Sequence, residues 1–309
     1  MQRALAAGRG FTRAAARRSL SSDAALFDGE TAELYGRIFN QHYHPQGPWG
    51  MMVESAVEKV SSSTSPTLLD IATGPGQPGT LLAQALPAAT VTLSDIAPDM
   101  ITMATDLVAE SGVTNAELAV VDAQDMPFAD ESFNVVTCCY GFMFCPEPEK
   151  AFSEVARVLK PGGALITTVW TDLAVMGLMK RIMTALLDEA PPPPPINPMS
   201  MAPPGMLEEL VSDAGLRVES TAESAYPFDM GAVDPATGEV DDMAFKLIVL
   251  PITPSIQNLV ESGAKPDAWA TARSIVNSAL DEGVVARIES DGSILTRPNV
   301  FKMLVATKP

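Results

Sequence analysis

Residues 68–79, which read LLDIATGPGQPG, decide the fold. The first part is apolar, as expected for a buried strand, and the glycines that follow let the backbone turn sharply. A strand, a glycine-rich turn and a helix start present free backbone N–H groups where small polar ligands bind. The stretch therefore predicts an α/β protein with a ligand site directly after its first strand.

From Thr67 onward, short apolar runs alternate with longer amphipathic segments, which is the pattern of a parallel sheet with crossover helices. The expected strands are residues 67–70, 90–94, 117–121, 133–140, 164–170, 216–220 and 300–307. The expected helices are residues 78–86, 98–110, 147–159, 172–188 and 206–214. This order predicts a doubly wound sheet. Residues 191–195 are all proline and predict a stiff connector.

Composition excludes several classes of function. The 309 residues carry 38 acidic and 20 basic side chains, for a net charge of −18, which disfavours nucleic acid and anionic membrane surfaces as partners. No uninterrupted apolar stretch approaches the roughly 20 residues that cross a bilayer. The three cysteines lie within eight residues of one another, so we expect reduced thiols. No set of side chains has metal-ligand spacing, and we expect no metal.

Residues 1–22 hold five arginines and no acid in an Ala/Ser-rich background. This composition is typical of an organelle transit peptide. A mitochondrial location is the first expectation, with a chloroplast or cytoplasmic location as the alternatives. A basic tail without a targeting role also stays open.

Several features downstream of the glycine-rich turn occur in a characteristic order. Asp95 follows the second strand, about 20 residues after the turn, where an acid commonly binds ribose hydroxyls. Residues 133–136 (FNVV) precede a turn at 159–163 (LKPGG), and the chain closes on an apolar strand. In this order they resemble the motifs of class I S-adenosylmethionine-dependent methyltransferases, in the small-molecule branch that includes ubiquinone and menaquinone C-methyltransferases. Ala72 and Asn134 depart mildly from the usual glycine and acid of that family.

The resemblance implies a seven-stranded, mainly parallel, Rossmann-like sheet with S-adenosylmethionine as cofactor and a small-molecule methyl acceptor as partner. By the family's pattern, the cofactor-binding residues are Asp70, Ala72, Thr73, Gly74, Gly76, Asp95, Ile96, Asp122, Ala123 and Tyr35. It also implies lid helices at 23–65 and a cofactor-binding core at 66–228 and 290–309. Residues 229–289 have the size and pattern of a helical cap inserted over the substrate. A homodimer stays open as the assembly.

Two other readings of the cofactor turn remain. A dinucleotide site needs G-x-G-x-x-G, whereas Ala72 takes the first glycine position and Pro75 and Pro78 remove amide donors. An NAD-dependent oxidoreductase is therefore the lesser alternative. A non-catalytic protein that keeps the methyltransferase fold as a binding or assembly factor is the alternative to an enzyme.

His42 and His44 are the only histidines and share one short segment of the expected lid. An imidazole there has the chemistry of a general base for an acceptor hydroxyl. We predict His42, His44 and Tyr140 as catalytic residues. The alternative for the two histidines is an ordinary position in a polar surface loop.

Overall fold

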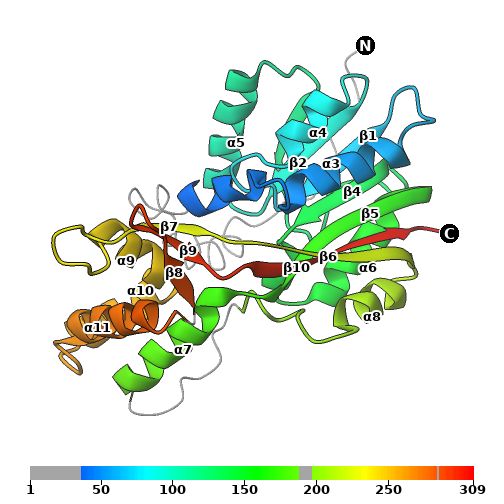
Figure 1. Ribbon diagram of the computed structural model, residues 1–309. Helices are drawn as coiled ribbons and strands as arrows, with labels where there is room; N and C mark the ends of the chain where they lie inside the picture. Colours follow the sequence, from blue (N-terminus) through cyan, green and yellow to red (C-terminus); the bar gives the residue numbers. More distant parts are fainter. Residues whose placement is uncertain (1–35, 188–196, 284) are drawn as a thin grey trace.

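The computed structural model describes residues 36–187, 197–283 and 285–309. The predicted transit peptide, Tyr35 and the proline connector at 191–195 lie outside the described residues. The centre is a seven-stranded sheet in the order β3-β2-β1-β4-β5-β10-β6 (Figure 1). Its strands are β1 (Thr67–Ile71), β2 (Thr90–Asp95), β3 (Ala116–Val120), β4 (Phe133–Cys139), β5 (Leu159–Asp172), β6 (Arg217–Tyr226) and β10 (Asn299–Thr307).

The first five strands run parallel, and β10 is antiparallel to both β5 and β6. The helical segments of this core are η2 (Asn40–Tyr43), α3 (Pro48–Lys59), α4 (Gly79–Ala85), α5 (Pro98–Ser111), η3 (Phe142–Phe144), α6 (Pro148–Val158), α7 (Ala174–Leu187) and α8 (Met206–Asp213). The predicted doubly wound, mainly parallel sheet is confirmed. Strand order reverses between β1 and β4, and ligands of such sheets bind at this switch point.

Helix starts follow local chemistry. Pro98 and Pro148 occupy the first positions of α5 and α6, where a missing N–H costs little. In α6, Phe152 and Val155 are buried against the sheet, whereas Glu149 and Lys150 are exposed. This spacing gives one apolar face per helix, so each crossover packs on the sheet in a single orientation.

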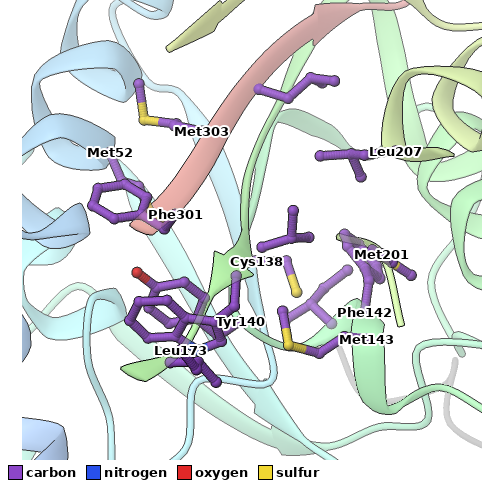
Figure 2. Close-up of a cluster of buried hydrophobic side chains, with 14 of the residues drawn as sticks. Met52, Cys138, Tyr140, Phe142, Met143, Leu173, Met201, Leu207, Phe301 and Met303 are labelled. Atoms are coloured by element: carbon purple, nitrogen blue, oxygen red, sulfur yellow. The ribbon is translucent and has the colours of Figure 1, made fainter. Parts of the chain in front are cut away.

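Both faces of the sheet carry packed apolar side chains. Met52 from α3 and Leu207 from α8 lie on opposite sides of β10 and are fully buried (Figure 2). Phe301 and Met303 point to the Met52 side of β10. The antiparallel strand β10 thus closes the core on both faces.

Residues 159–163 differ from the prediction of a turn. They extend β5 at its start, and the pairing register with β4 shifts between Phe133 and Val135. Gly162 has φ +76°, which absorbs the irregularity. The glycines therefore make a bulge inside a long strand and do not form a separate turn.

Asn134 connects three strands near their amino ends, which is the end of the sheet opposite the predicted site. Its Oδ1 accepts hydrogen bonds from the Thr67 amide (3.0 Å) and from Lys160 Nζ (3.0 Å). The Asn134 side chain therefore links β1, β4 and β5.

Residues between β6 and β10 form an insertion that begins at β7. It contains β7 (Asp229–Ala232), α9 (Asp242–Val249), η4 (Leu250–Ile252), α10 (Thr253–Glu261), α11 (Ala268–Asp281), β8 (Ala286–Ile288) and β9 (Ser293–Thr296). The three strands pair in a separate antiparallel sheet, β7-β9-β8. The predicted helical insertion at 229–289 is therefore helical only in part. Because β9 pairs with β7 and β8, residues 293–296 belong to the insertion, although the prediction assigned residues 290–309 to the core.

Ion pairs hold the insertion to the core. Arg297 makes a two-bond ion pair with Asp172 at the end of β5, and Arg181 of α7 pairs with Glu282 at 2.8 Å and 2.9 Å. Helix α11 lies along α7 (Figure 1).

Within the described residues, one helical run, Asp242–Glu261, is long and apolar enough to cross a membrane by length and composition. A third of its most apolar 18-residue stretch is buried inside the molecule.

Candidate active site

The cofactor loop, residues 72–78, connects β1 to α4 at the switch point. Gly74 has φ +58° and donates its amide to Asp95 Oδ2 at 2.9 Å. Asp95 Oδ1 accepts the amide of Ala97 at 2.9 Å. The carboxylate at the end of β2 thus fixes the loop after β1 and brings together Gly74 and Asp95, whose cofactor contacts stay predictions.

Gly76 is needed for packing. A Cβ atom there would lie 3.1 Å from Ala104 Cα of α5, and the φ of +111° already favours glycine. Gly76 lets α5 approach the loop closely. The predicted direct cofactor contact at Gly76 is thus accompanied by a structural need for glycine.

Asp70 lies under the loop and is fully buried. Its Oδ1 accepts a hydrogen bond from Thr137 Oγ1 of β4 at 2.6 Å. Asp70 Oδ2 and Thr73 Oγ1 are buried and have no regular hydrogen-bond partner, although the Thr73 hydroxyl and the Gly79 amide lie near enough to favour the ionised carboxylate. Burial outweighs these contacts and raises the pKa of Asp70 to about 6. Burial raises the pKa of Asp95 as well.

Ala72 adopts a conformation that side chains avoid. Its φ is +53°, which explains why a glycine is usual at this position. A Cβ atom on Gly141, just beyond β4, would stand 2.6 Å from both Ala72 Cβ and Cys138 Sγ. The methyl group of Ala72 therefore fills the space that the absent side chain of Gly141 leaves, and this contact joins the cofactor loop to the end of β4.

The segment after β3 forms its own turn. Asp122 Oδ1 accepts hydrogen bonds from the Gln124 amide (2.8 Å) and side chain (3.2 Å), beside the half-buried Ala123. Arg157 of α6 donates to the carbonyl oxygens of Met126 (3.0 Å) and Phe128 (2.7 Å), which fixes this turn. Ile96 is 45% exposed at the end of β2 and presents an apolar surface at the same edge of the sheet.

The lid segment, residues 39–47, contacts both the cofactor loop and the insertion. Tyr43 OH accepts a hydrogen bond from Gln77 Nε2 at 2.7 Å. Gln41 exchanges two hydrogen bonds with the backbone of Asp229 in β7, at 2.8 Å and 2.5 Å. The lid therefore bridges the loop and the insertion. Tyr35 lies outside the described residues, so its predicted cofactor contact stays a prediction.

An aromatic cluster fills the space between the lid and the carboxyl ends of β4 and β5. Its members come from the lid, α3, β5, β6, β10 and the segments after β4 and β6, and they are His42, Trp49, Tyr140, Trp170, Tyr226, Phe228 and Phe301. Tyr140 stacks on Trp170 with ring centroids 4.0 Å apart. Tyr140 also has φ +56°, and such strained residues gather at functional sites.

The two histidines occupy different environments. His42 is 8% exposed and its Nδ1 lies 2.6 Å from Tyr226 OH. Burial lowers the pKa of His42 to about 3, so the imidazole is uncharged near neutral pH. His44 is half-buried, stacks on Tyr226, and accepts the Gln46 amide at Nδ1. The alternative of an ordinary position in a polar surface loop is therefore wrong for His42, because this residue is buried inside the aromatic cluster.

Tyr226, Trp170 and Gln77 are site residues that sequence reasoning missed. Tyr226 lies 86 positions after Tyr140 in the chain, and only the β6–β10–β5 pairing brings the two hydroxyl groups to 3.4 Å. The aromatic pair Tyr226 and Phe228 around one proline at the end of a strand was the available signal. Among the described residues, no three His, Cys, Asp or Glu side chains gather as metal ligands.

Comparison with known proteins matches a methyltransferase domain to residues 69–167. The chain is 37% identical over 114 residues to the demethylmenaquinone methyltransferase of Thermus thermophilus, covering 37% of this chain and 50% of that protein. It is 29% identical over 138 residues to the methyltransferase GfsG of Streptomyces halstedii, covering 44% of this chain and 48% of that protein. The chain therefore spans about half the length of these curated relatives.

A solved structure extends the likeness in fold. A Bacillus halodurans protein classed as a methyltransferase aligns with a TM-score of 0.52 at 20% identity, over 83% of this chain and 98% of that one. The matched family region ends at residue 167, so the lid, Tyr226 and the insertion lie outside it.

The loop residues fit S-adenosylmethionine. The cofactor carries a sulfonium, an ammonium and a carboxylate group, for a net charge of +1, and it has ribose hydroxyl groups. Beside the loop, the ends of β1 and β2 offer the buried carboxyl groups of Asp70 and Asp95, and burial disfavours their charge. A cationic ligand relieves that cost. The unpartnered Asp70 Oδ2 and Thr73 Oγ1 would hold the polar end of the cofactor, and Asp95 would hold its hydroxyl groups.

Replacing Asp95 with alanine should weaken S-adenosylhomocysteine binding by about 10- to 100-fold, because charge-assisted hydrogen bonds to hydroxyl groups contribute about 1.5–3 kcal/mol. Titration calorimetry measures the change. Asp99→Ala, at an exposed acid four residues along the chain, is the matched control. Unchanged affinity in Asp95→Ala would contradict the assignment, and urea unfolding of both variants checks that the loop remains folded.

The Ala72–Gly141 contact can be tested by a double-mutant cycle. Gly141→Ala should destabilise the protein by about 1–3 kcal/mol because the new methyl group has no room. Adding Ala72→Gly should recover part of this loss, since it removes one of the two close atoms while Cys138 Sγ remains. Gly177→Ala, in α7 where a Cβ meets nothing, is the control. Strict additivity of the two substitutions would show that the contact is absent.

Proposed function

We propose that the class I S-adenosylmethionine-dependent methyltransferase domain formed by residues 69–167 works, together with the lid and the insertion, as an enzyme that methylates a small apolar or aromatic molecule. The family resemblance predicted from the motifs is confirmed for this domain. One observation carries the proposal. The Ala72–Gly141 contact places the cofactor loop, with Asp70 and Asp95 beside it, next to the aromatic cluster, so a cation site and an apolar site share one border.

The chain's task in such a transfer is positioning. When bound, the cofactor supplies an electrophilic methyl group on a sulfonium sulfur, and the acceptor's lone pair forms the new bond as the carbon–sulfur bond breaks. Holding the two reactants in line can contribute about 7–11 kcal/mol. Asp70 and Asp95, beside the loop, would hold the cofactor, while the lid and the insertion would exclude water from the acceptor.

The acceptor side favours small molecules. The aromatic cluster is buried beneath the lid and bordered by the insertion, so a macromolecular substrate would need extensive opening. The strongly acidic surface disfavours nucleic acid as acceptor. Aromatic rings bind apolar and aromatic ligands through their faces.

The predicted general-base roles need refinement for His42. Burial that lowers its pKa to about 3 also penalises the imidazolium that a base must become. His42 therefore suits a hydrogen-bonding role better than proton storage. His44 and Tyr140 remain proposed catalytic residues, although burial raises the pKa of Tyr140 well above its usual range and keeps that hydroxyl protonated.

A binding or assembly protein with the same fold is the second candidate. The tight packing of the aromatic cluster favours it, since no open acceptor cavity is needed for cofactor binding alone. The oxidoreductase alternative is weaker, because two buried acids oppose a diphosphate. Separate calorimetric titrations with S-adenosylhomocysteine and NAD distinguish these cofactors.

A labelled-methyl assay against metabolite extracts tests turnover. Transfer of label to a small molecule is expected, and cofactor binding without transfer to any fraction would favour the binding protein.

With the acceptor so identified, His44→Gln should lower kcat by about 10²- to 10⁴-fold if His44 is the base, with unchanged cofactor affinity. The effect of His42→Gln should be equal at pH 6 and pH 8, because burial keeps this imidazole uncharged at both.

We also propose that residues 1–22 direct the protein to mitochondria. Their five arginines and the absence of acids support this proposal. A fluorescent protein fused to these residues should enter mitochondria, and replacing the arginines with glutamine should abolish import. Chloroplast signal would favour the second location, and cytosolic signal from the unaltered fusion would refute a targeting role.

A further inference from the structure

Three consecutive residues of η2 contact three different parts of the molecule. Gln41 contacts the insertion, His42 contacts the aromatic cluster, and Tyr43 contacts the cofactor loop. A 3-10 helix has three residues per turn, so consecutive side chains point about 120° apart. One turn of backbone therefore carries three side chains in three directions.

Backbone contacts make this turn a single body. The His44 amide donates to the Gln41 carbonyl at 3.0 Å, and the Gly47 amide donates to the His44 carbonyl at 2.7 Å. Gly47 packs so closely that a Cβ atom there would lie 2.5 Å from the His42 carbonyl oxygen. The lid segment therefore moves as a unit, and Tyr43 cannot lift from the loop while Gln41 stays in place.

The lid segment covers the cofactor loop at two points. A Cβ atom on Gly74 would lie 3.6 Å from the Phe39 ring, so this ring rests on the loop at a glycine of positive φ. Tyr43 OH lies 2.7 Å from Nε2 of Gln77, which is itself buried. The lid segment therefore lies on the path of a ligand that binds this loop.

The insertion holds the lid segment through two hydrogen bonds to one residue. Gln41 Nε2 donates to the Asp229 carbonyl at 2.8 Å, and Gln41 Oε1 accepts the Asp229 amide at 2.5 Å. Both partners are backbone groups, so the contact needs an amide side chain at position 41 and no particular side chain at position 229. Figure 1 shows this first part of the described chain, in dark blue, beside β7.

The position of Asp229 is fixed from the core. Asn299 is fully buried at the root of the insertion, where its Oδ1 accepts the Ala174 amide at 2.9 Å and its Nδ2 donates to Thr296 Oγ1 at 3.3 Å. Thr296 in turn bonds both backbone groups of Phe228, at 2.8 Å and 2.9 Å. Because Phe228 directly precedes Asp229, the insertion offers the lid segment a fixed attachment point.

We propose that Gln41 is a latch through which the insertion controls how fast the cofactor is exchanged. This inference rests on the proposed cofactor site at residues 72–78. The latch residues lie outside that loop, so the latch closes with or without the cofactor and must break each time the cofactor enters or leaves. Such a contact slows both steps equally and leaves the dissociation constant unchanged. Lid opening limits turnover in many enzymes, so the latch would set the release of S-adenosylhomocysteine after methyl transfer.

The first experiment measures the exchange of S-adenosylhomocysteine in the full chain. Release of labelled ligand during a chase with unlabelled ligand gives the dissociation rate, and calorimetry gives the dissociation constant. The association rate follows from the two values. Gln41→Leu removes both hydrogen bonds and should raise both rates by about 5- to 150-fold, as expected for the loss of two uncharged hydrogen bonds. The dissociation constant should stay within about two-fold of the wild-type value, because closed states with and without ligand lose the same contact.

Two variants are matched controls. Gln257→Leu makes the same substitution in α10 of the insertion, where the glutamine bonds Glu261 at 2.7 Å. Asp229→Asn changes the side chain of the latch partner and keeps its backbone groups. Both controls should leave the two rates unchanged. If Gln41→Leu fails to fold, Gln41→Glu keeps the acceptor for the Asp229 amide but loses the donor to its carbonyl, and it should also raise both rates.

A second experiment tests transmission along the turn. The Asp229 amide exchanges with deuterium when Gln41 releases it, so its exchange rate in NMR reports opening of the latch. Tyr43→Phe removes the hydrogen bond to the cofactor loop and should speed this exchange by about two- to ten-fold, the effect of one lost hydrogen bond. The Val233 amide, which donates to the Gly292 carbonyl within the insertion, should exchange at an unchanged rate.

Unchanged rates in both Gln41 variants would overturn the inference. Faster dissociation with an unchanged association rate would also overturn it, since that pattern marks the loss of a direct contact with the ligand. Unchanged exchange at Asp229 in Tyr43→Phe would do the same, because the turn would not act as one body. Each of these results, with S-adenosylhomocysteine still bound, would leave the methyltransferase function standing. Failure of the wild-type protein to bind this ligand would instead contradict the proposed function, and the inference with it.

Discussion

The Asp70 carboxyl group, buried where β1 meets the cofactor loop, is the constraint on which the site depends. Thr137 of β4 bonds its side chain, and Ser94 of β2 donates to its carbonyl oxygen at 3.0 Å. Three neighbouring strands are thus tied together at one residue. A carboxyl group held in this way is costly, since burial raises its pKa to about 6. A buried acid whose pKa is raised by burial is the pattern of a ligand site.

The neighbouring packing explains why this loop has little freedom to change. Gly79 admits no side chain, because a Cβ would stand 2.9 Å from Asp70 Oδ2 and even closer to Leu93. Gly76 is held by α5 and Gly74 by the Asp95 carboxylate. At Ala72 a side chain occupies a position with positive φ, and Gly141 gives its methyl group room. The departure from the usual glycine is therefore compensated by a glycine on the next strand.

Local chemistry made much of the fold predictable from sequence. The strands β1, β2 and β3 are short runs bounded by turn residues. Their hydrophobic pattern and these turn residues located each strand to within a residue or two. The β5 bulge was harder, because Pro161 and two glycines carry the same signal as a turn, and pairing with β4 decides the outcome. The small sheet β7-β9-β8 escaped prediction since its strands are three or four residues long. Tyr226 could not be placed at the site because its partners depend on the order of strands far apart in sequence.

Two chemically distinct compartments meet at the Ala72–Gly141 contact, and the lid reaches both. On one side, Asp70 and Asp95 favour a cation; on the other, uncharged hydroxyl groups and aromatic rings favour a neutral molecule. Tyr43 bonds Gln77 of the loop, whereas Gln41 bonds β7 of the insertion. Because a single residue of the lid separates Gln41 from Tyr43, a shift of the cofactor loop on ligand binding must be transmitted to the insertion or break one of the two hydrogen bonds. His42 lies between them and is held by Tyr226, so the same short segment that closes the cofactor side also sets the polar groups of the acceptor side.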